Sequence, residues 1–545
     1  NYKMQMMRSF EENESRAMLY VYSFINGADW ADEVQQLDRM SKITKQDVVD
    51  WANKYLGPES YAIVYKREGK DPNEQKIAAP KITPIVTNRD SQSEFLTEIQ
   101  NSKVEPIEPV FVDYKKDMSQ FEAQKGVNVL YKKNETNDIF TLIYVFNTGT
   151  ENDPALNLAF DYLSYLGTDK MSAEQIASEM YAIACSFGLS AGTNQSWIEI
   201  SGLSENMGKA MEIVEGLIAG AQPNEEILQN LKGDMIKSRA DAKLNQSRCF
   251  GALQRYMIYG SDFIRRTTLT DPALQGLTSE QLLAKIGDLM GKQHEVLYYG
   301  PQDEAEVKAA LAAHHKVAAD LQPLEKKFST LQPTDENKVM LAQYDAKQLY
   351  YMQYSNRGEK FDLAADPQIT LYNEYFGGGM NTIVFQEMRE ARGLAYSAWA
   401  NLAIPTNAKG DYYYMAFIAT QNDKMQKAIE AFDEIINNMP ESEKAFDIAK
   451  EALISRLRTE RTVKDGVLWS YIRMRDLGLT EPRGKQIFEK AQQMTLADVK
   501  AAQEKWVKGR KYVYGILGDI QDLDLNYLKT LGPIQTVTQE EIFGY

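Results

Sequence analysis

One stretch decides how this chain is interpreted: YFGGGMNTIVFQEMREARGLAYSAWA, residues 375–400. It opens with three consecutive glycines and continues with apolar residues spaced to form one face of a helix. Gly393 is placed to end that helix in the left-handed conformation, and the residues after it are predicted to form a strand. Arg389 would then lie at the end of the helix and Tyr396 on the strand, so the two polar side chains could converge on one ligand.

The same stretch also fits an ordinary helix–turn–strand corner. A glycine run is usually a turn, and an arginine near a helix C-terminus usually complements the helix dipole. A phosphate-binding loop does not fit, because the glycines are not followed by the lysine that would contact the phosphates. The choice between a corner and a binding site therefore depends on the rest of the chain.

A second pattern occurs three times at spacings typical of whole domains. Each copy has a threonine N-cap, an acidic or amide residue three positions later, and a predicted strand after the helix. The helices begin after Thr44, Thr278 and Thr495, and the strands are predicted at 61–65, 295–299 and 511–517. Each copy is expected to close one structural unit.

The two complete units open in the same way, with predicted strands at 126–131 and 140–146 in one and at 338–344 and 348–354 in the other. In each, a helix and two further strands follow. Strands paired as hairpins with helices on one face predict an α+β fold rather than a parallel doubly wound sheet. We expect two homologous units, each a mainly antiparallel sheet covered by helices, plus the helical and strand tail of a preceding unit.

This repeat predicts four segments. Residues 1–68 are expected to be the C-terminal tail of an incomplete upstream domain, and 69–119 an extended, proline-rich linker or hinge. Residues 120–325 and 326–545 are expected to be the two complete units, of which the second carries Arg389 and Tyr396.

The amino-acid composition excludes some classes of function. The formal net charge of −16 argues against a general nucleic-acid binder, which needs a basic surface. No apolar run approaches the length of a membrane span, and the composition is that of a soluble globular protein. Cytoplasmic, periplasmic and secreted locations all remain open. Cys185 and Cys249 are predicted to be buried thiols, with one disulfide as the alternative.

No residues in the chain predict a metal site or a nucleophile–base pair. Of the three histidines, His294 precedes a predicted strand and is expected to face solvent. His314 and His315 are adjacent in a helix, so they point about 100° apart and would not share a metal. The chain contains no C-x-x-C, G-x-S-x-G or H-E-x-x-H motif.

The repeated α+β units, the long linker and the sequence R-E-A-R-G-L-A-Y after a glycine-rich helix start together resemble the pitrilysin/insulysin family of zinc peptidases, the inverzincins. The resemblance covers the whole chain as the C-terminal half of such a protein, with the tail of its second domain. It implies that Arg389 and Tyr396 bind the peptide substrate and support the transition state. We therefore expect both side chains to line a concave surface, free of an ion-pair partner within the chain.

The resemblance also implies where zinc is absent. The family motif H-x-x-E-H corresponds here to Leu158-Ala-Phe-Asp161-Tyr162, so both histidines are replaced. The region expected to hold the remaining zinc-binding Glu, 234–239, has no clear equivalent. We therefore assign no metal ligand and no cofactor to this chain, and expect zinc in the N-terminal half of the protein.

Two functions remain as expectations. In the first, the chain closes the catalytic chamber and holds the peptide while the N-terminal half, or an active partner subunit, hydrolyses it. In the second, it is a non-catalytic partner or structural subunit of the same family. In both cases the isolated chain is expected to be inactive, and the sequence does not reveal the peptide specificity.

Overall fold

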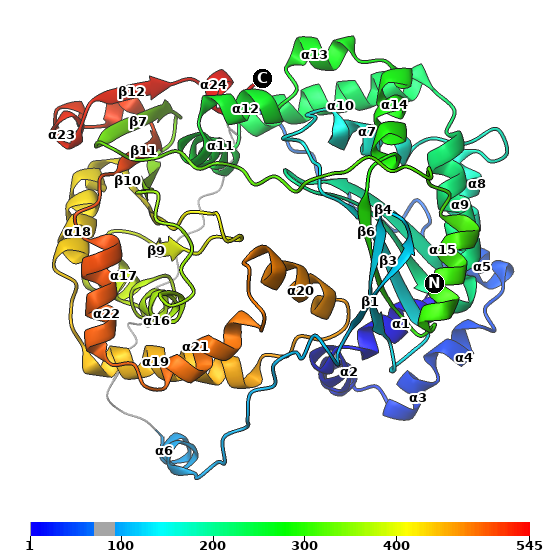
Figure 1. The fold of residues 1–545 in the computed structure, drawn as a ribbon, viewed down its shortest axis with the longest axis horizontal. Coiled ribbons are helices and arrows are strands. Elements are labelled where there is room, and N and C mark those ends of the chain that lie inside the picture. Colours follow the sequence, from blue (N-terminus) through cyan, green and yellow to red (C-terminus); the bar gives the residue numbers. More distant parts are fainter. Residues whose placement is uncertain (1, 70–92) are drawn as a thin grey trace. The chain divides into compact units, whose positions relative to one another are not determined.

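The computed structural model describes residues 2–69 and 93–545 of the chain. It contains two compact units, one of residues 5–107 and one of residues 108–545, to which the first four residues also belong. The first unit is helical, and the second contains two six-stranded sheets (Figure 1). Residues 70–92, part of the predicted linker, lie outside the described residues.

The N-terminal unit contains six helices among its described residues: α1 Tyr2–Phe10, α2 Asn13–Asn26, α3 Trp30–Val34, α4 Gln36–Met40, α5 Lys45–Tyr55 and α6 Glu94–Asn101. The predicted capping box is present, because Thr44 and Asp47 exchange side-chain and backbone hydrogen bonds at the start of α5. The strand predicted at 61–65 is not formed. A strand needs a neighbouring backbone to pair with, and these residues have none among those described.

The first sheet has the strand order β1-β2-β6-β3-β5-β4. Its strands are β1 Ser119–Gln124, β2 Val127–Lys133, β3 Ile139–Phe146, β4 Cys185–Ala191, β5 Ser196–Leu203 and β6 His294–Gly300. All neighbours are antiparallel except β2 and β6. The prediction that β2 and β3 form a hairpin was wrong, because the closing strand β6 lies between them.

The second sheet has the order β12-β7-β11-β8-β10-β9. Its strands are β7 Lys338–Gln343, β8 Gln348–Ser355, β9 Ser397–Ala403, β10 Tyr413–Gln421, β11 Val513–Gly518 and β12 Ile534–Val537. Here too the closing strand, β11, separates the two strands that were expected to pair directly. Five strands therefore follow the same order in both sheets, which confirms the predicted pair of α+β units.

Helices cover one face of each sheet and form its main core. On the first sheet these are α7 Leu156–Leu163, α8 Ala173–Ala182, α9 Met207–Gly220, α14 Ser279–Met290 and α15 Glu304–His314. On the second they are α16 Asp366–Phe376, α17 Ile383–Phe385, α18 Met425–Asn437, α19 Glu443–Thr459, α21 Arg483–Ala491, α22 Leu496–Ala502 and α23 Leu525–Leu531. Capping boxes at Thr278 and Thr495 start α14 and α22 as predicted.

The opposite faces are covered by an exchange of helices. Helix α11 (Gln246–Tyr259) follows α10 (Glu225–Lys243) and packs Phe250 and Met257 against the second sheet. Helix α20 (Gly466–Asp476) packs Leu468 and Ile472 against the first sheet. Figure 1 shows α20 between the two sheets. Each of the two α+β units around the sheets therefore completes the core of the other, which the sequence pattern did not predict.

The remaining helices are short: α12 Ser261–Thr267, α13 Asp271–Gly276 and α24 Gln539–Phe543. Cys185 and Cys249 are both buried, in β4 and α11. Among the described residues, no helix is both long and apolar enough to span a bilayer.

Candidate functional site

The glycine turn joins α16 to the edge of the second sheet. Gly377 N–H donates to the Asn373 carbonyl at 2.9 Å, and Ala400 N–H donates to the Gly377 carbonyl at 3.3 Å. A Cβ atom on Gly377 would lie 2.3 Å from the Asn373 oxygen, far inside van der Waals contact. Only glycine therefore lets the end of α16 lie directly against β9, whose outer edge it covers.

The segment that carries Arg389 is a wide helical turn. Helix α17 continues into a π-helical segment, Gln386–Ala391, in which Met388 is fully buried. Leu394 N–H donates to the Met388 carbonyl at 2.9 Å, and Gly393 has a φ of 57° as expected of a left-handed helix end. Such π-turns are frequent at functional sites. The following strand β9 begins at Ser397, so Tyr396 precedes the strand instead of lying on it.

The structure brings Arg389 and Tyr396 together. The guanidinium carbon of Arg389 lies 4.4 Å from the centre of the Tyr396 ring and 4.9 Å from the centre of the Phe385 ring. Arg389 Nε also lies 3.5 Å from Glu390 Oε1. We expected Arg389 to have no ion-pair partner within the chain, and that was wrong. The cation is held between two rings and one carboxylate.

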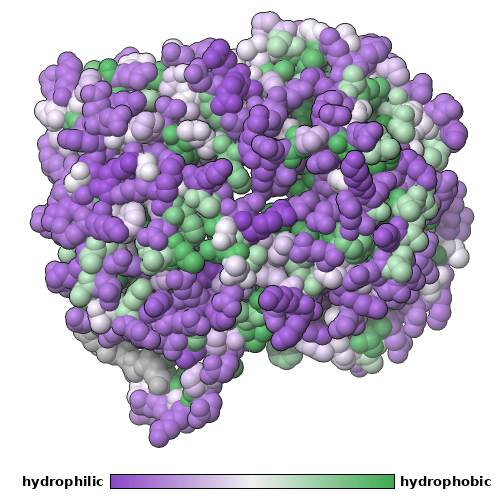
Figure 2. All heavy atoms as spheres, in the orientation of Figure 1, coloured by the Kyte–Doolittle hydropathy of each residue, from purple (hydrophilic) through white to green (hydrophobic). Residues whose placement is uncertain are grey.

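Tyr396 is 80% exposed, which is unusual for a large aromatic side chain. Within the part of the chain that the structure describes, its hydroxyl forms no hydrogen bond. Figure 2 shows hydrophobic atoms among hydrophilic ones near the middle of the face seen in Figure 1, over β9. An exposed ring with a free hydroxyl and an arginine stacked on it can offer both apolar contact and hydrogen-bond donors to a ligand.

The position that corresponds to the zinc motif is part of the core. Leu158 and Tyr162 in α7 are buried. The Tyr162 hydroxyl accepts a hydrogen bond from Asn224 N–H at 2.7 Å and lies 2.8 Å from Ser279 Oγ. An apolar side chain and a fully bonded phenol do not fit a metal. Across residues 2–69 and 93–545, no group of three His, Cys, Asp or Glu side chains is arranged to hold one.

His294 does not face solvent, contrary to expectation: it is buried at the start of β6. Its Nδ1 lies 2.8 Å from the Lys292 carbonyl, and its Nε2 lies 2.8 Å from His315 Nε2. His315 Nδ1 is 2.5 Å from Glu215 Oε1. Because the carbonyl can only accept, His294 carries its proton on Nδ1 and accepts from His315 Nε2–H, and His315 shares a further proton with Glu215.

This buried hydrogen-bond network explains why the pKa of His294 is low. Burial, reinforced by the charge on His315, lowers the pKa of His294 to about 4. The His315 backbone follows α15, Glu215 lies on α9 and His294 on β6, so the network joins three elements around the first sheet. No periodic pattern predicts this network, since Glu215 lies far from the two histidines in the chain.

Residues 291–453 match a known family, described as the peptidase M16 inactive domain. The chain is similar to this family over 163 of its 545 residues. It is also similar, at 23% identity over 269 residues, to an uncharacterized zinc protease of Streptomyces coelicolor; the match spans 46% of this chain and 56% of that protein. These findings confirm the resemblance to zinc peptidases.

Solved structures show the same fold. A crystal structure of a peptidase M16 inactive domain from Pseudomonas fluorescens superposes with a TM-score of 0.60 at 19% identity, covering 74% of this chain and 98% of that one. The periplasmic protease PqqL from Escherichia coli superposes with a TM-score of 0.57 at 13% identity, covering 89% of this chain and 52% of PqqL. The fold of the M16 inactive domain thus recurs in about half the length of a protease.

Proposed function

We propose that this chain is the non-catalytic half of a zinc-dependent endopeptidase, in which Arg389 and Tyr396 hold the peptide substrate. The main observation in support is the pair itself, an exposed tyrosine whose ring centre lies 4.4 Å from the guanidinium carbon of the arginine, next to a π-helical turn. A tyrosine in a structural corner would bury its ring, whereas 80% of this one is exposed.

The two side chains have separate roles in this proposal. Arg389 is anchored by Phe385 and Glu390, so its remaining N–H groups point from a fixed position toward the carbonyl groups of a bound peptide. The Tyr396 hydroxyl donates a hydrogen bond where negative charge develops on the scissile carbonyl oxygen. The metal chemistry belongs to the other half, because the motif position in this chain is filled by Leu158 and Tyr162.

A partner surface for the other half is offered by residues 5–107. This unit exposes large apolar side chains that proteins normally bury, including Phe24 at 86% and Val64 at 90%. By the repeat, residues 61–65 correspond to β6 and β11, which are both interior strands. We propose that polypeptide of the catalytic half pairs with this segment and covers the apolar face.

The alternative is a partner or structural subunit that never contacts substrate. The description of the matching family as an inactive domain is compatible with this function as well. The two proposals differ in what Arg389 and Tyr396 do once an active half is present. In a purely structural subunit, changing their polar groups leaves peptide hydrolysis unchanged.

The test is reconstitution. The chain is combined with the polypeptide that carries H-x-x-E-H, and hydrolysis of a quenched fluorescent peptide is measured for each half alone and for the pair. We expect activity from the pair only. Activity of the zinc half that does not rise when this chain is added would contradict a role in the catalytic chamber.

A further inference from the structure

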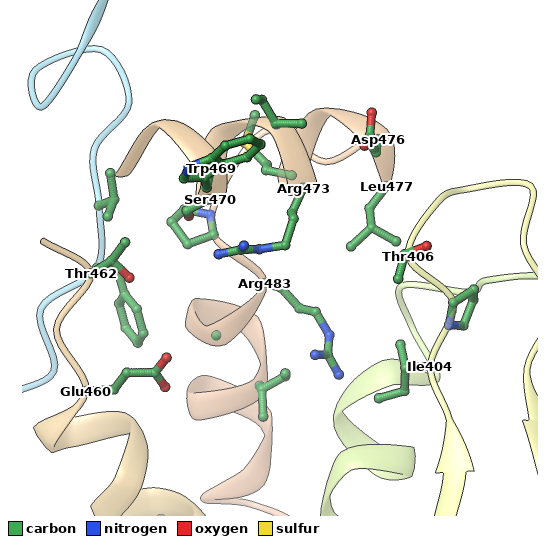
Figure 3. A pocket seen from close by; sticks show the side chains of 18 of the residues that line it. Ile404, Thr406, Glu460, Thr462, Trp469, Ser470, Arg473, Asp476, Leu477 and Arg483 are labelled. Carbon is green, nitrogen blue, oxygen red and sulfur yellow. The ribbon is translucent and has the colours of Figure 1, made fainter. Parts of the chain in front are cut away.

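The unit of residues 108–545 contains a cavity of about 810 Å³ that is separate from Arg389 and Tyr396. It lies where the turn between β4 and β5 and the segment around Tyr114 meet α19, α20 and α21 (Figure 3). Its size is that of a site for a small molecule or a few residues of peptide. Because its walls come from the segments around both sheets, an occupant would contact both halves of this unit.

The walls are mainly apolar and aromatic. Trp197, Phe328, Ile404, Leu457, Trp469 and Leu477 all line the cavity. Figure 3 shows Trp469 on α20 and Leu477 directly after it at one side, and Ile404 at another. Large apolar walls around a few polar groups are typical of a ligand site, in which burial supplies affinity and the polar groups fix orientation.

Most of the charges that line the cavity are already neutralised. Arg483 forms a fork with the buried carboxylate of Asp366, with Nη2 2.6 Å from Oδ1. Lys326 Nζ lies 2.5 Å from Asp476 Oδ2. A third cation, Arg456, forms an ion pair with Glu374. These groups are structural and leave little charge for a ligand.

Two opposite charges in the cavity remain. Among the residues that the structure describes, the side chains of Arg473 and Glu460 form neither an ion pair nor a hydrogen bond. Burial raises the pKa of the Tyr114 hydroxyl, and a hydrogen bond with Ser470 and the nearby Arg473 charge oppose that rise. Figure 3 shows the Arg473 side chain reaching from α20 into the cavity and the Glu460 carboxylate facing the cavity from the end of α19.

We propose that this cavity binds the carboxyl-terminal end of a peptide whose last residues are apolar. The carboxylate pairs with Arg473, the apolar side chains contact Trp469 and Ile404, and a backbone N–H donates to Glu460. An apolar carboxylate could also be a fatty acid. That ligand has no donor for Glu460 and would leave an unpaired carboxylate beside its own, so the peptide is the better match.

Calorimetric titration of the full chain tests this with three probes: acetyl-Ala-Leu-Leu with a free carboxylate, its carboxamide, and decanoate. We expect saturable binding of the peptide acid, with the amide and decanoate weaker by about tenfold or more. Arg473→Gln should weaken binding of the acid by about tenfold or more and leave binding of the amide unchanged. Arg473 has no partner to lose, so the variant should melt at the parent temperature.

Lys485→Gln is the charge-matched control. It removes a positive charge from α21 outside the cavity, where Lys485 pairs with Glu481, and should leave binding unchanged. Tyr396→Phe should also leave binding at this cavity unchanged. The test of this inference is therefore independent of the test of the proposed function. Equal affinity for acid and amide, or full affinity in Arg473→Gln, would overturn the site. Decanoate binding as tightly as the peptide acid would overturn the assignment to a peptide.

Discussion

The guanidinium carbon of Arg389 lies 4.4 Å from the centre of the Tyr396 ring. This contact joins the π-helical turn to the residue that precedes β9 and leaves the tyrosine hydroxyl in solvent. The two side chains were selected from the sequence because a helix end and a strand start would bring them close. The structure shows them in contact through the ring face, which sequence spacing alone does not predict.

We expect substitution by alanine to be strongly destabilising at Gly377 and to be tolerated at Gly379. Gly377→Ala should lower the melting temperature strongly, because the new Cβ would lie 2.3 Å from the Asn373 carbonyl oxygen. Gly379→Ala is the matched control, since its nearest neighbour, a Thr382 methyl group, lies 3.6 Å away in ordinary contact. Calorimetry on both variants checks this. Equal melting temperatures would show that α16 does not end against β9 as described.

Two titratable groups, the buried His294 and the partly buried Asp433, should make stability depend on pH in opposite directions. His294 has a folded-state pKa of about 4, below its ordinary value of 6.5, so protonation favours unfolding and stability falls as pH drops from 6.5 toward 4. Between pH 7.5 and 5 the loss is about 2 kcal/mol. His294→Gln should remove this loss. Unfolding by urea at several pH values, compared with the parent, measures it, and an unchanged slope would contradict the burial of His294.

Asp433 acts in the other direction. Burial raises its pKa to about 6 from 3.8, despite a hydrogen bond from Gln353 Nε2 at 3.1 Å, so its ionisation destabilises the fold as pH rises from 4 to 6. Asp433→Asn should therefore raise stability at pH 7.5, by up to about 3 kcal/mol. The new amide could also donate to Gln353 Oε1, which has no hydrogen-bond partner among the described residues.

Comparing the pH profiles of the His294 and Asp433 variants tests both pKa shifts more strictly than either profile alone. Compared with the parent, the His294 variant should gain stability as the pH falls toward 5, because the loss from His294 protonation is absent. With Asp433 replaced, the chain should become less stable toward pH 5. Profiles that tilt in the same direction would show that one of the two shifts has the wrong sign.

The isolated chain should bind no stoichiometric zinc. The physical reason is that the motif position holds Leu158 and the hydrogen-bonded Tyr162 hydroxyl in place of two imidazoles. Elemental analysis after dialysis measures the metal content. A tightly bound zinc in each chain would contradict the account, and Tyr162→Phe would then show whether α7 contributes to the site.

Local signals in the sequence predicted local structure. The three threonine-capped helices and the left-handed Gly393 were predicted because each depends on hydrogen bonds or backbone preferences within a few residues. The burial of His294 was missed because its partners, Glu215 and His315, come from other elements. Both insertions of a closing strand between two earlier ones were missed for the same reason, since strand neighbours are set by non-local packing.

The boundaries predicted at 68, 119 and 325 remain predictions, and the exchange of α11 and α20 between the sheets had no counterpart in the pattern. The sequence of an amphipathic helix predicts which of its faces is buried, but it does not predict which sheet that face packs against. The cavity beside Arg473 arises from this exchange, because α20 supplies part of its wall.

The most direct test of the account is the turnover of the reconstituted enzyme with Tyr396→Phe in this chain. Loss of one donor to a developing oxyanion should lower kcat by about 10²–10³-fold, while the melting temperature stays at the parent value because the exposed ring is retained. Arg389→Ala should raise KM, lower kcat, or both. Full activity in a variant that carries both substitutions would contradict the proposal that these residues hold the substrate.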